Sequence, residues 1–121
     1  MVDKSKIEQV VAETMAANED LQGIVVCNAK GEVIFGHSIA AGIKHDDVAD
    51  LVVKIAGNSS QLSSRLDKGG LKEVSIAADS GFIIILGDVK IVLAGLAGES
   101  ARESLGLVRI ALRRALMSML G

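Results

Sequence analysis

The residue types that most often perform chemistry are few and scattered in this sequence. His37 and His45 lie in separate segments, and neither has a cysteine or carboxylate at the spacing of a metal site. Cys27 is the only cysteine and has no histidine near it in sequence, which favours a buried structural thiol over a nucleophile. The sequence therefore predicts no metal centre, no catalytic residue and no cofactor, and a protein that is not an enzyme.

A glycine-rich segment, GLAGES from Gly95 to Ser100, joins an apolar run to the start of a helix. Backbone amides at such a place can hold a phosphate. The segment lacks the lysine of a phosphate-binding loop, however, and the carboxylate of Glu99 would repel a phosphate. We therefore expect these glycines to allow a strand and a helix to pack closely.

Arginines gather along the flank of the last amphipathic segment. Arg102, Arg109 and Arg113 follow its apolar stripe, and Arg114 adds to their charge. Such a ridge either meets an acidic partner or is a solvated helix flank whose aliphatic stems cover apolar surface. The sequence leaves both interpretations open.

Composition excludes several classes of function. The 121 residues (12.6 kDa) fit a single domain, 1–121, and half of them are apolar, with two phenylalanines and no tryptophan, tyrosine or proline. A net charge of −2 leaves no electrostatic footprint for nucleic acid. The charged N-terminus MVDKSKIEQ is not a signal peptide, and the single cysteine fits a reducing cytoplasm. We expect a cytoplasmic protein that hides some apolar surface against a partner.

The most apolar stretch, GFIIILGDVKIVLAGLAG, runs from Gly81 to Gly98 and raises the question of a membrane span. A spanning helix needs about 20 apolar residues, whereas Asp88 and Lys90 interrupt this stretch near its middle. Each half is short and rich in Ile, Val and Leu, with Gly87-Asp88 between the halves. This pattern predicts a β-hairpin and no membrane insertion.

The remaining patterns predict the element order α-ββ-α-βββ-α. Two capping boxes, Ser5 with Glu8 and Ser100 with Glu103, indicate the starts of the first and last helices, and NAKG indicates a turn between the first two strands. We expect helices at 3 or 5 to 18, at 46–66 and from 100 onward, and strands at 21–28, 32–37, 71–77, 82–86 and 90–97.

The polarity of the strands predicts their order in the sheet. Strands 21–28, 82–86 and 90–97 are apolar on both faces, so helices should cover both sides of them. Strands 32–37 and 71–77 are more mixed and belong at the edges. The fold class is therefore α+β, with a five-stranded antiparallel sheet of order 2-1-5-4-3. The first and third helices share one face, and the second helix lies alone on the other.

The second helix carries three stripes at about 100° per residue. The apolar stripe, which we expect to face the core, comprises Val48, Leu51, Val52, Ile55, Leu62 and Leu66. The polar stripe, which we expect to bind a partner, comprises Asp50, Lys54, Gln61 and Arg65. The stripe between them has small residues that let a second helix approach closely: Ala49, Val53, Ala56, Ser60 and Ser64.

One helix cannot cover one face of five strands, so the sequence predicts a homodimer. Edge strand 71–77 is free to pair with its copy, which would bring two copies of the second helix together over a ten-stranded sheet. The expected interface is the small stripe together with Lys72, Val74 and Ile76. The alternative is that the small stripe is additional core.

Taken together, four segments resemble the Roadblock family, the dynein-light-chain and MglB-like domains. They are DLQGIVVCNAKGEVIFGHS, HDDVADLVVKIAGNSSQLSSRL, LKEVSIAADSGFIIILGDVKIVLAGLAG and the closing helix, and the resemblance covers about 7–120. It implies homo- or heterodimers formed through the third strand and second helix. It also implies a non-catalytic platform that regulates or anchors small Ras-like GTPases or links cargo to motors. The chain resembles a stand-alone, prokaryote-like member, and the lack of tails argues against a motor-linked role.

Three functions therefore compete. The first is a homodimeric scaffold or regulator of a small Ras-like GTPase, acting by activation or by recruitment. The second is a subunit of a larger assembly that pairs with a paralogous Roadblock-type chain. The third is a small-molecule sensor, which needs an internal pocket with convergent polar groups that this aliphatic core offers few residues to line.

Overall fold

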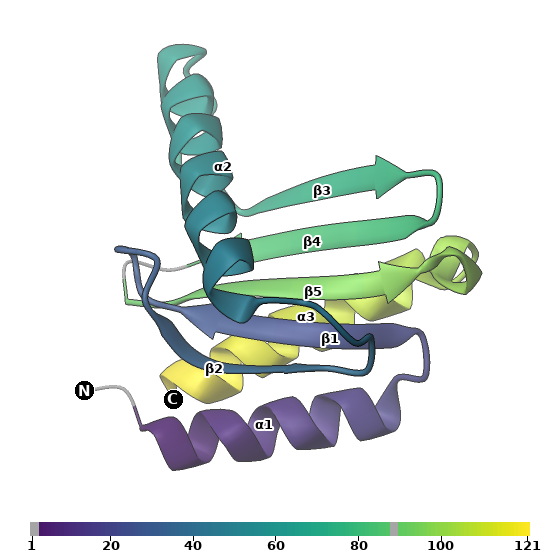
Figure 1. Cartoon of the computed structure of the whole chain (residues 1–121). Helices are drawn as coiled ribbons and strands as arrows, with labels where there is room; N and C mark the ends of the chain where they lie inside the picture. The colour runs from purple at the N-terminus through teal and green to yellow at the C-terminus, as the bar shows by residue number, and fades with distance from the viewer. Residues whose placement is uncertain (1–2, 88–89) are drawn as a thin grey trace.

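The structure is a computed structural model that describes residues 3–87 and 90–121. Its elements are α1 (Lys4–Ala17), β1 (Leu21–Cys27), β2 (Val33–Ser38), α2 (His45–Arg65), β3 (Glu73–Ala78), β4 (Gly81–Gly87), β5 (Val92–Gly98), a 3₁₀ helix (Glu99–Arg102) and α3 (Leu105–Leu120), as Figure 1 shows. The strands form one antiparallel sheet of order β2-β1-β5-β4-β3. The predicted element order, fold class and strand order are confirmed.

The β1–β2 hairpin forms because the turn residues satisfy its backbone. The side-chain oxygen of Asn28 accepts hydrogen bonds from the backbone amides of Lys30 (2.9 Å) and Glu32 (3.0 Å). Gly31 has a φ of 86°, a conformation that side chains disfavour. The turn predicted at NAKG is confirmed. The turn predicted at Gly87-Asp88 includes Asp88, which lies outside the described residues.

The apolar stretch that raised the question of a membrane span is the middle of the sheet. β4 and β5 pair antiparallel, from Gly81 opposite Gly98 to Gly87 opposite Val92. Within 3–87 and 90–121, no helix has the length and apolarity needed to cross a membrane. The prediction of two paired strands is confirmed.

The start of α1 differs from the predicted capping box. The N-cap is Asp3, whose carboxylate accepts a hydrogen bond from the backbone amide of Lys6 at 3.3 Å. Ser5 already lies inside the helix, so its predicted role as the cap is wrong. Aspartate competes well with serine at this position because its side-chain oxygen reaches the same free amides.

The capping box predicted at Ser100 is also wrong, because this serine has another acceptor. Ser100 lies in the 3₁₀ helix, and α3 begins later, at Leu105. The hydroxyls of Ser100 and Ser104 donate to the two carboxylate oxygens of Asp20, at 3.1 and 2.5 Å. These bonds join the connection between β5 and α3 to the loop between α1 and β1.

The three helices divide between the two faces of the sheet as predicted (Figure 1). α1 and α3 lie side by side on one face, over a core that includes Ile7, Val11, Ile24, Val26, Ile84, Leu86, Leu93 and Leu112. α2 lies alone on the other face, over a smaller core formed by Val25, Cys27, Ala49, Val52, Ile85, Val92 and Ala94. The two faces therefore differ in how completely they are covered.

α2 covers only one end of its face and then leaves the sheet. Figure 1 shows it crossing the sheet near one end of the strands and running on past the edge strand β3. Its buried residues, Ala49 and Val52, lie in its first half, and no residue between Gly57 and Arg65 is buried. Half of α2 thus projects beyond its own sheet.

Candidate functional site

The prediction that the whole apolar stripe of α2 faces the core is wrong. Leu51, Leu62 and Leu66 have exposed fractions of 59, 61 and 60%. Because α2 crosses only one end of the sheet, a narrow line of residues that includes Ala49 reaches the core. We call the exposed leucines, together with the half-buried Ile55, the leucine flank.

The small stripe lies on the opposite flank of α2. Ala49 is fully buried in the chain's own core, so its predicted place in a dimer interface is corrected. Val53 and Ala56 are half-buried, whereas Ser60 and Ser64 are exposed. Val53, Ala56 and Ser60 line a groove of about 400 Å³ with residues of the β1–β2 turn and of β4 and β5. The small stripe therefore faces the β1–β2 turn, and the leucine flank faces away from it.

The end of the sheet that α2 leaves uncovered is apolar. Ile76 of β3 lies opposite Ile83 of β4, which lies opposite Leu96 of β5, so the three side chains form one row across the strands. All three are half-buried. This open row (Ile76, Ile83 and Leu96) lies on the same face as the neighbouring row that contains Val74 and Ile85, because residues two apart on a strand share a face.

Strand β3 is an edge that nothing blocks. Within the described residues it pairs only with β4, from Glu73 opposite Leu86 to Ala78 opposite Gly81. The strand contains no proline and no lysine, two residues that commonly protect an edge against pairing with another chain. Lys72 is exposed immediately before the strand. The outer side of β3 can therefore accept a further strand.

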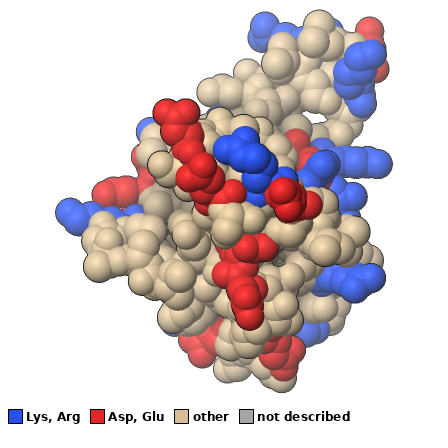
Figure 2. Space-filling view, turned by 90° about the vertical axis from the view of Figure 1, so that its right-hand side faces the viewer, with Lys and Arg blue, Asp and Glu red and all other residues tan. Residues whose placement is uncertain are grey.

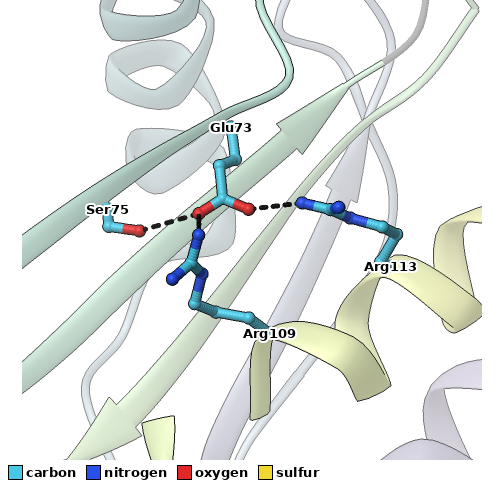
Figure 3. A network of polar contacts seen from close by, with 4 residues as sticks. All are labelled: Glu73, Ser75, Arg109 and Arg113. Atoms are coloured by element: carbon cyan, nitrogen blue, oxygen red, sulfur yellow. Dashed lines mark hydrogen bonds and ion pairs between the residues drawn. The ribbon is translucent and has the colours of Figure 1, made fainter. Parts of the chain in front are cut away.

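Ion pairs hold this edge strand to α3 on the other face of the sheet (Figure 3). The carboxylate of Glu73 pairs with Arg109 and with Arg113, the latter at 2.5 Å, and Ser75 Oγ donates to it at 3.3 Å. The Glu73 side chain is only 14% exposed. The sequence indicated the arginine ridge but not this acceptor, because β3 and α3 are distant in the chain.

The predicted polar stripe lies on the outer side of α2. Asp50, Lys54, Gln61 and Arg65 are all exposed. Lys54 Nζ lies 3.0 Å from Asp50 Oδ2, and both side chains are more than 60% exposed, so this pair contributes little to stability. Figure 2 shows the end of α2 standing clear of the main body, with charged side chains at its tip. The polar stripe is therefore open to a partner along the helix.

The residues singled out for chemistry are not assembled into a site. Within 3–87 and 90–121, no group of three or more His, Cys, Asp or Glu side chains is placed to hold a metal ion. Cys27 is buried as predicted, and burial raises the pKa of its thiol, which disfavours the thiolate. His37 is exposed on β2, and His45 begins α2 with its Nε2 3.3 Å from Ser38 Oγ.

Close packing requires a glycine at Gly95, whereas the neighbour of Gly98 is a flexible, exposed side chain that can move. A Cβ atom on Gly95 would lie 2.5 Å from Leu112 Cδ1 of α3, and one on Gly98 would lie 2.5 Å from Gln22 Nε2. The prediction that these glycines let a strand and a helix approach closely is confirmed at Gly95.

Comparison with known proteins finds likeness in structure alone. No protein-family model matches the sequence, and no curated protein matches it. MglB of Myxococcus xanthus has a TM-score of 0.85 at 14% identity, over 96% of this chain and 86% of that one. An MglB described as having a tetrameric arrangement has a TM-score of 0.79 at 20% identity, over 93% of this chain and 83% of that one. A Roadblock/LC7 domain from Streptomyces avermitilis has a TM-score of 0.67 at 19% identity, over 90% and 96%.

At these levels of identity the likeness establishes the fold. The chain has the fold of the Roadblock and MglB-like domains, as the resemblance in sequence implied. Sequence reasoning missed the leucine flank and the open row as a joint surface. The signal that could have indicated them is the number of apolar residues on α2, which is larger than one end of a sheet can bury.

Proposed function

We propose that this chain, with its Roadblock and MglB-like fold, is a homodimeric, non-catalytic platform that binds a small Ras-like GTPase. One observation carries the proposal: α2 projects beyond its own sheet with its leucine flank exposed, beside an apolar row that no element within 3–87 and 90–121 covers. The family resemblance supplies the class of partner.

A second copy of the chain fits these features together. If β3 pairs antiparallel with β3 of the copy, a two-fold axis runs perpendicular to the sheet between the two strands. This axis carries each α2 to the opposite end of the strands of the other copy. There, the projecting half of each α2 lies over the open row of its partner, and the two leucine flanks face each other.

The proposed interface therefore keeps Val74 and Ile76 from the predicted set and replaces the small stripe by the leucine flank. Lys72 and the exposed Ser60 and Ser64 lie at its margin. Burying the exposed leucines of both copies contributes on the order of 5–10 kcal/mol before the cost of association. This contribution offsets much of the cost of association, which is about 4–15 kcal/mol.

The polar stripe of α2 supplies the platform in this proposal. Two-fold pairing doubles Asp50, Lys54, Gln61 and Arg65 across the axis, so a partner meets a broad polar surface. The platform acts on GTP hydrolysis, if at all, by positioning residues of the GTPase itself, because the proposal assigns no catalytic residue to this chain.

Binding to purified GTPases tests the proposal. Each small Ras-like GTPase of the source organism is loaded with GDP or with a non-hydrolysable GTP analogue and titrated with the chain in a calorimeter. We expect saturable binding in at least one nucleotide state, weakened about tenfold by Lys54→Glu, which reverses a charge on the platform. The control Lys30→Glu makes the same change in the β1–β2 turn and should bind as the wild type does.

Failure to bind in either nucleotide state would contradict the GTPase proposal. A chain that stays monomeric alone but pairs with a Roadblock-type paralogue would instead contradict the homodimer. The two parts of the proposal can therefore fail separately.

A further inference from the structure

A second exposed apolar surface runs along the outer side of α3, on the face of the sheet opposite α2. Leu107, Ile110 and Met117 have exposed fractions of 68, 50 and 67%. Arg114 lies on the same side of the helix, since these four positions fall within one arc at 100° per residue. We call Leu107, Ile110, Arg114 and Met117 the α3 ridge. It lies apart from β3 and α2 and is independent of the proposed dimer.

Grooves flank the α3 ridge on both sides. The groove between α1 and α3 has a volume of about 490 Å³, and its lining includes small side chains from both helices, Ala17, Ala111 and Ala115. The groove on the other side has a volume of about 380 Å³ and is lined by residues of α3 that include Arg109 and Arg113. Helices pack by placing the side-chain ridges of one helix into the grooves of another, so a ridge between two grooves is a suitable surface for a second helix.

Arg114 is the charged group at the centre of this surface, and it lines both grooves. Arg109 and Arg113 are already paired with Glu73, whereas Arg114 forms no ion pair or hydrogen bond with any residue of 3–87 or 90–121. α3 itself contains no aspartate or glutamate. An unpaired guanidinium among exposed apolar side chains favours an apolar partner that carries a carboxylate.

We propose that the α3 ridge and the α1–α3 groove bind an amphipathic helix of another protein, with a carboxylate on that helix paired to Arg114. The α3 side of the groove runs from Leu107 to Ser118. This corresponds to about 17 Å, or about three turns of an incoming helix. Because the site lies on the opposite face from α2, the helix and a partner on α2 bind at the same time.

Two other occupants fit the surface less well. A second copy fits less well because its α3 would place its own arginines near Arg114, and like charges repel. Glu13 is the acidic residue lining the groove that could pair with them. An anionic membrane fits less well because Glu13, beside the α3 ridge, would repel its headgroups. Helices that lie on membranes also present a continuous apolar face, whereas this surface is grooved.

The test uses a designed amphipathic peptide of about four helical turns with leucines on one side and a glutamate among them. A second peptide has lysine in place of the glutamate. In fluorescence anisotropy the wild type is expected to bind the glutamate peptide more tightly than the lysine peptide. Arg114→Glu is expected to lose about tenfold in affinity for the glutamate peptide and to prefer the lysine peptide. The control Lys30→Glu keeps the wild-type preference.

A second variant, Ile110→Ser, removes an exposed apolar side chain without disturbing the core. It should lower the affinity for both peptides to a similar degree. Leu62→Arg places a charge in the leucine flank and is expected to prevent the proposed dimer. This variant should bind both peptides as the wild type does, which would show that the α3 site does not depend on the dimer.

Three results would overturn the proposal. The first is unchanged peptide preference in Arg114→Glu. The second is self-association of the Leu62→Arg variant that depends on Arg114. The third is binding to phosphatidylserine vesicles that is tighter than peptide binding and is lost in Arg114→Glu.

Discussion

The two faces of the sheet are built from the same apolar strands but are covered differently. On the α1/α3 face, two helices close over the strands, and side chains such as Ile84 and Leu112 are fully buried. On the α2 face, one helix covers one end of the strands and leaves Ile83 and its row half-buried, and Leu62 of α2 is itself exposed. Apolar residues on a helix therefore form either part of a core or an exposed surface that can bind a partner.

Removing a large side chain from the closed face should have the largest effect on stability. Leu112→Ala is expected to lower the free energy of unfolding by about 2–5 kcal/mol, because Leu112 is fully buried against Gly95 and its removal leaves a cavity. Urea unfolding followed by circular dichroism measures the loss. It should be the same at every protein concentration.

The same truncation on the open face should have a smaller effect on stability, and this effect should depend on protein concentration. Leu62→Ala should cost less than about 0.5 kcal/mol in solution dilute enough to dissociate the proposed dimer, because Leu62 is exposed in the single chain. If the proposed dimer forms, the loss should grow at higher concentration, since pairing would stabilise the wild type more than the variant. A loss equal to that of Leu112→Ala at all concentrations would show that the two faces are alike.

Removing the charge of Glu73, which pairs the edge strand β3 with α3, should lower the free energy of unfolding by a smaller amount. Glu73→Gln removes the charge that holds Arg109 and Arg113, and we expect a loss of about 1 kcal/mol, because both arginines are half exposed and solvent screens the pairs. The difference from the wild type should shrink in high salt. The control Asp50→Asn breaks the exposed pair with Lys54 and should leave stability unchanged. Equal losses in the two variants would show that Glu73 does not anchor β3.

The smallest expected effect concerns the thiol beneath α2. Burial raises the pKa of Cys27 above its usual value of 9.0, so the folded state holds its proton where the unfolded state has released it. The free energy of unfolding should therefore fall as pH rises above 9. Cys27→Ala should reduce this fall when both proteins are unfolded in urea between pH 8 and pH 10. An identical pH dependence would mean that burial does not raise the pKa of the Cys27 thiol.

Sequence predicted the fold because its signals are local. Asn28 and Gly31 specify their turn within a few residues, and the strand polarities determine which strands lie in the middle. The capping box at Ser100 failed because its hydroxyl bonds to Asp20, which is remote in sequence. Such an acceptor leaves no trace in local spacing.

The candidate site was predicted less well for a related reason. Helical periodicity correctly separated the three stripes of α2, but it does not tell where a helix crosses a sheet. α2 crosses at one end, so Ala49 of the small stripe is buried and Leu62 of the apolar stripe is exposed. The position of a helix over a sheet depends on contacts between distant segments, and these appear only in the structure.

Light scattering of the wild type and of Leu62→Arg shows whether a second copy covers the open end of the α2 face. We expect a wild-type mass of twice 12.6 kDa and a single-chain mass for the variant, with equal helical content by circular dichroism. The neighbouring change Gln61→Arg, on the polar stripe, should leave the double mass unchanged. A monomeric wild type at tens of micromolar, or a Leu62→Arg protein that keeps the double mass, would contradict the account.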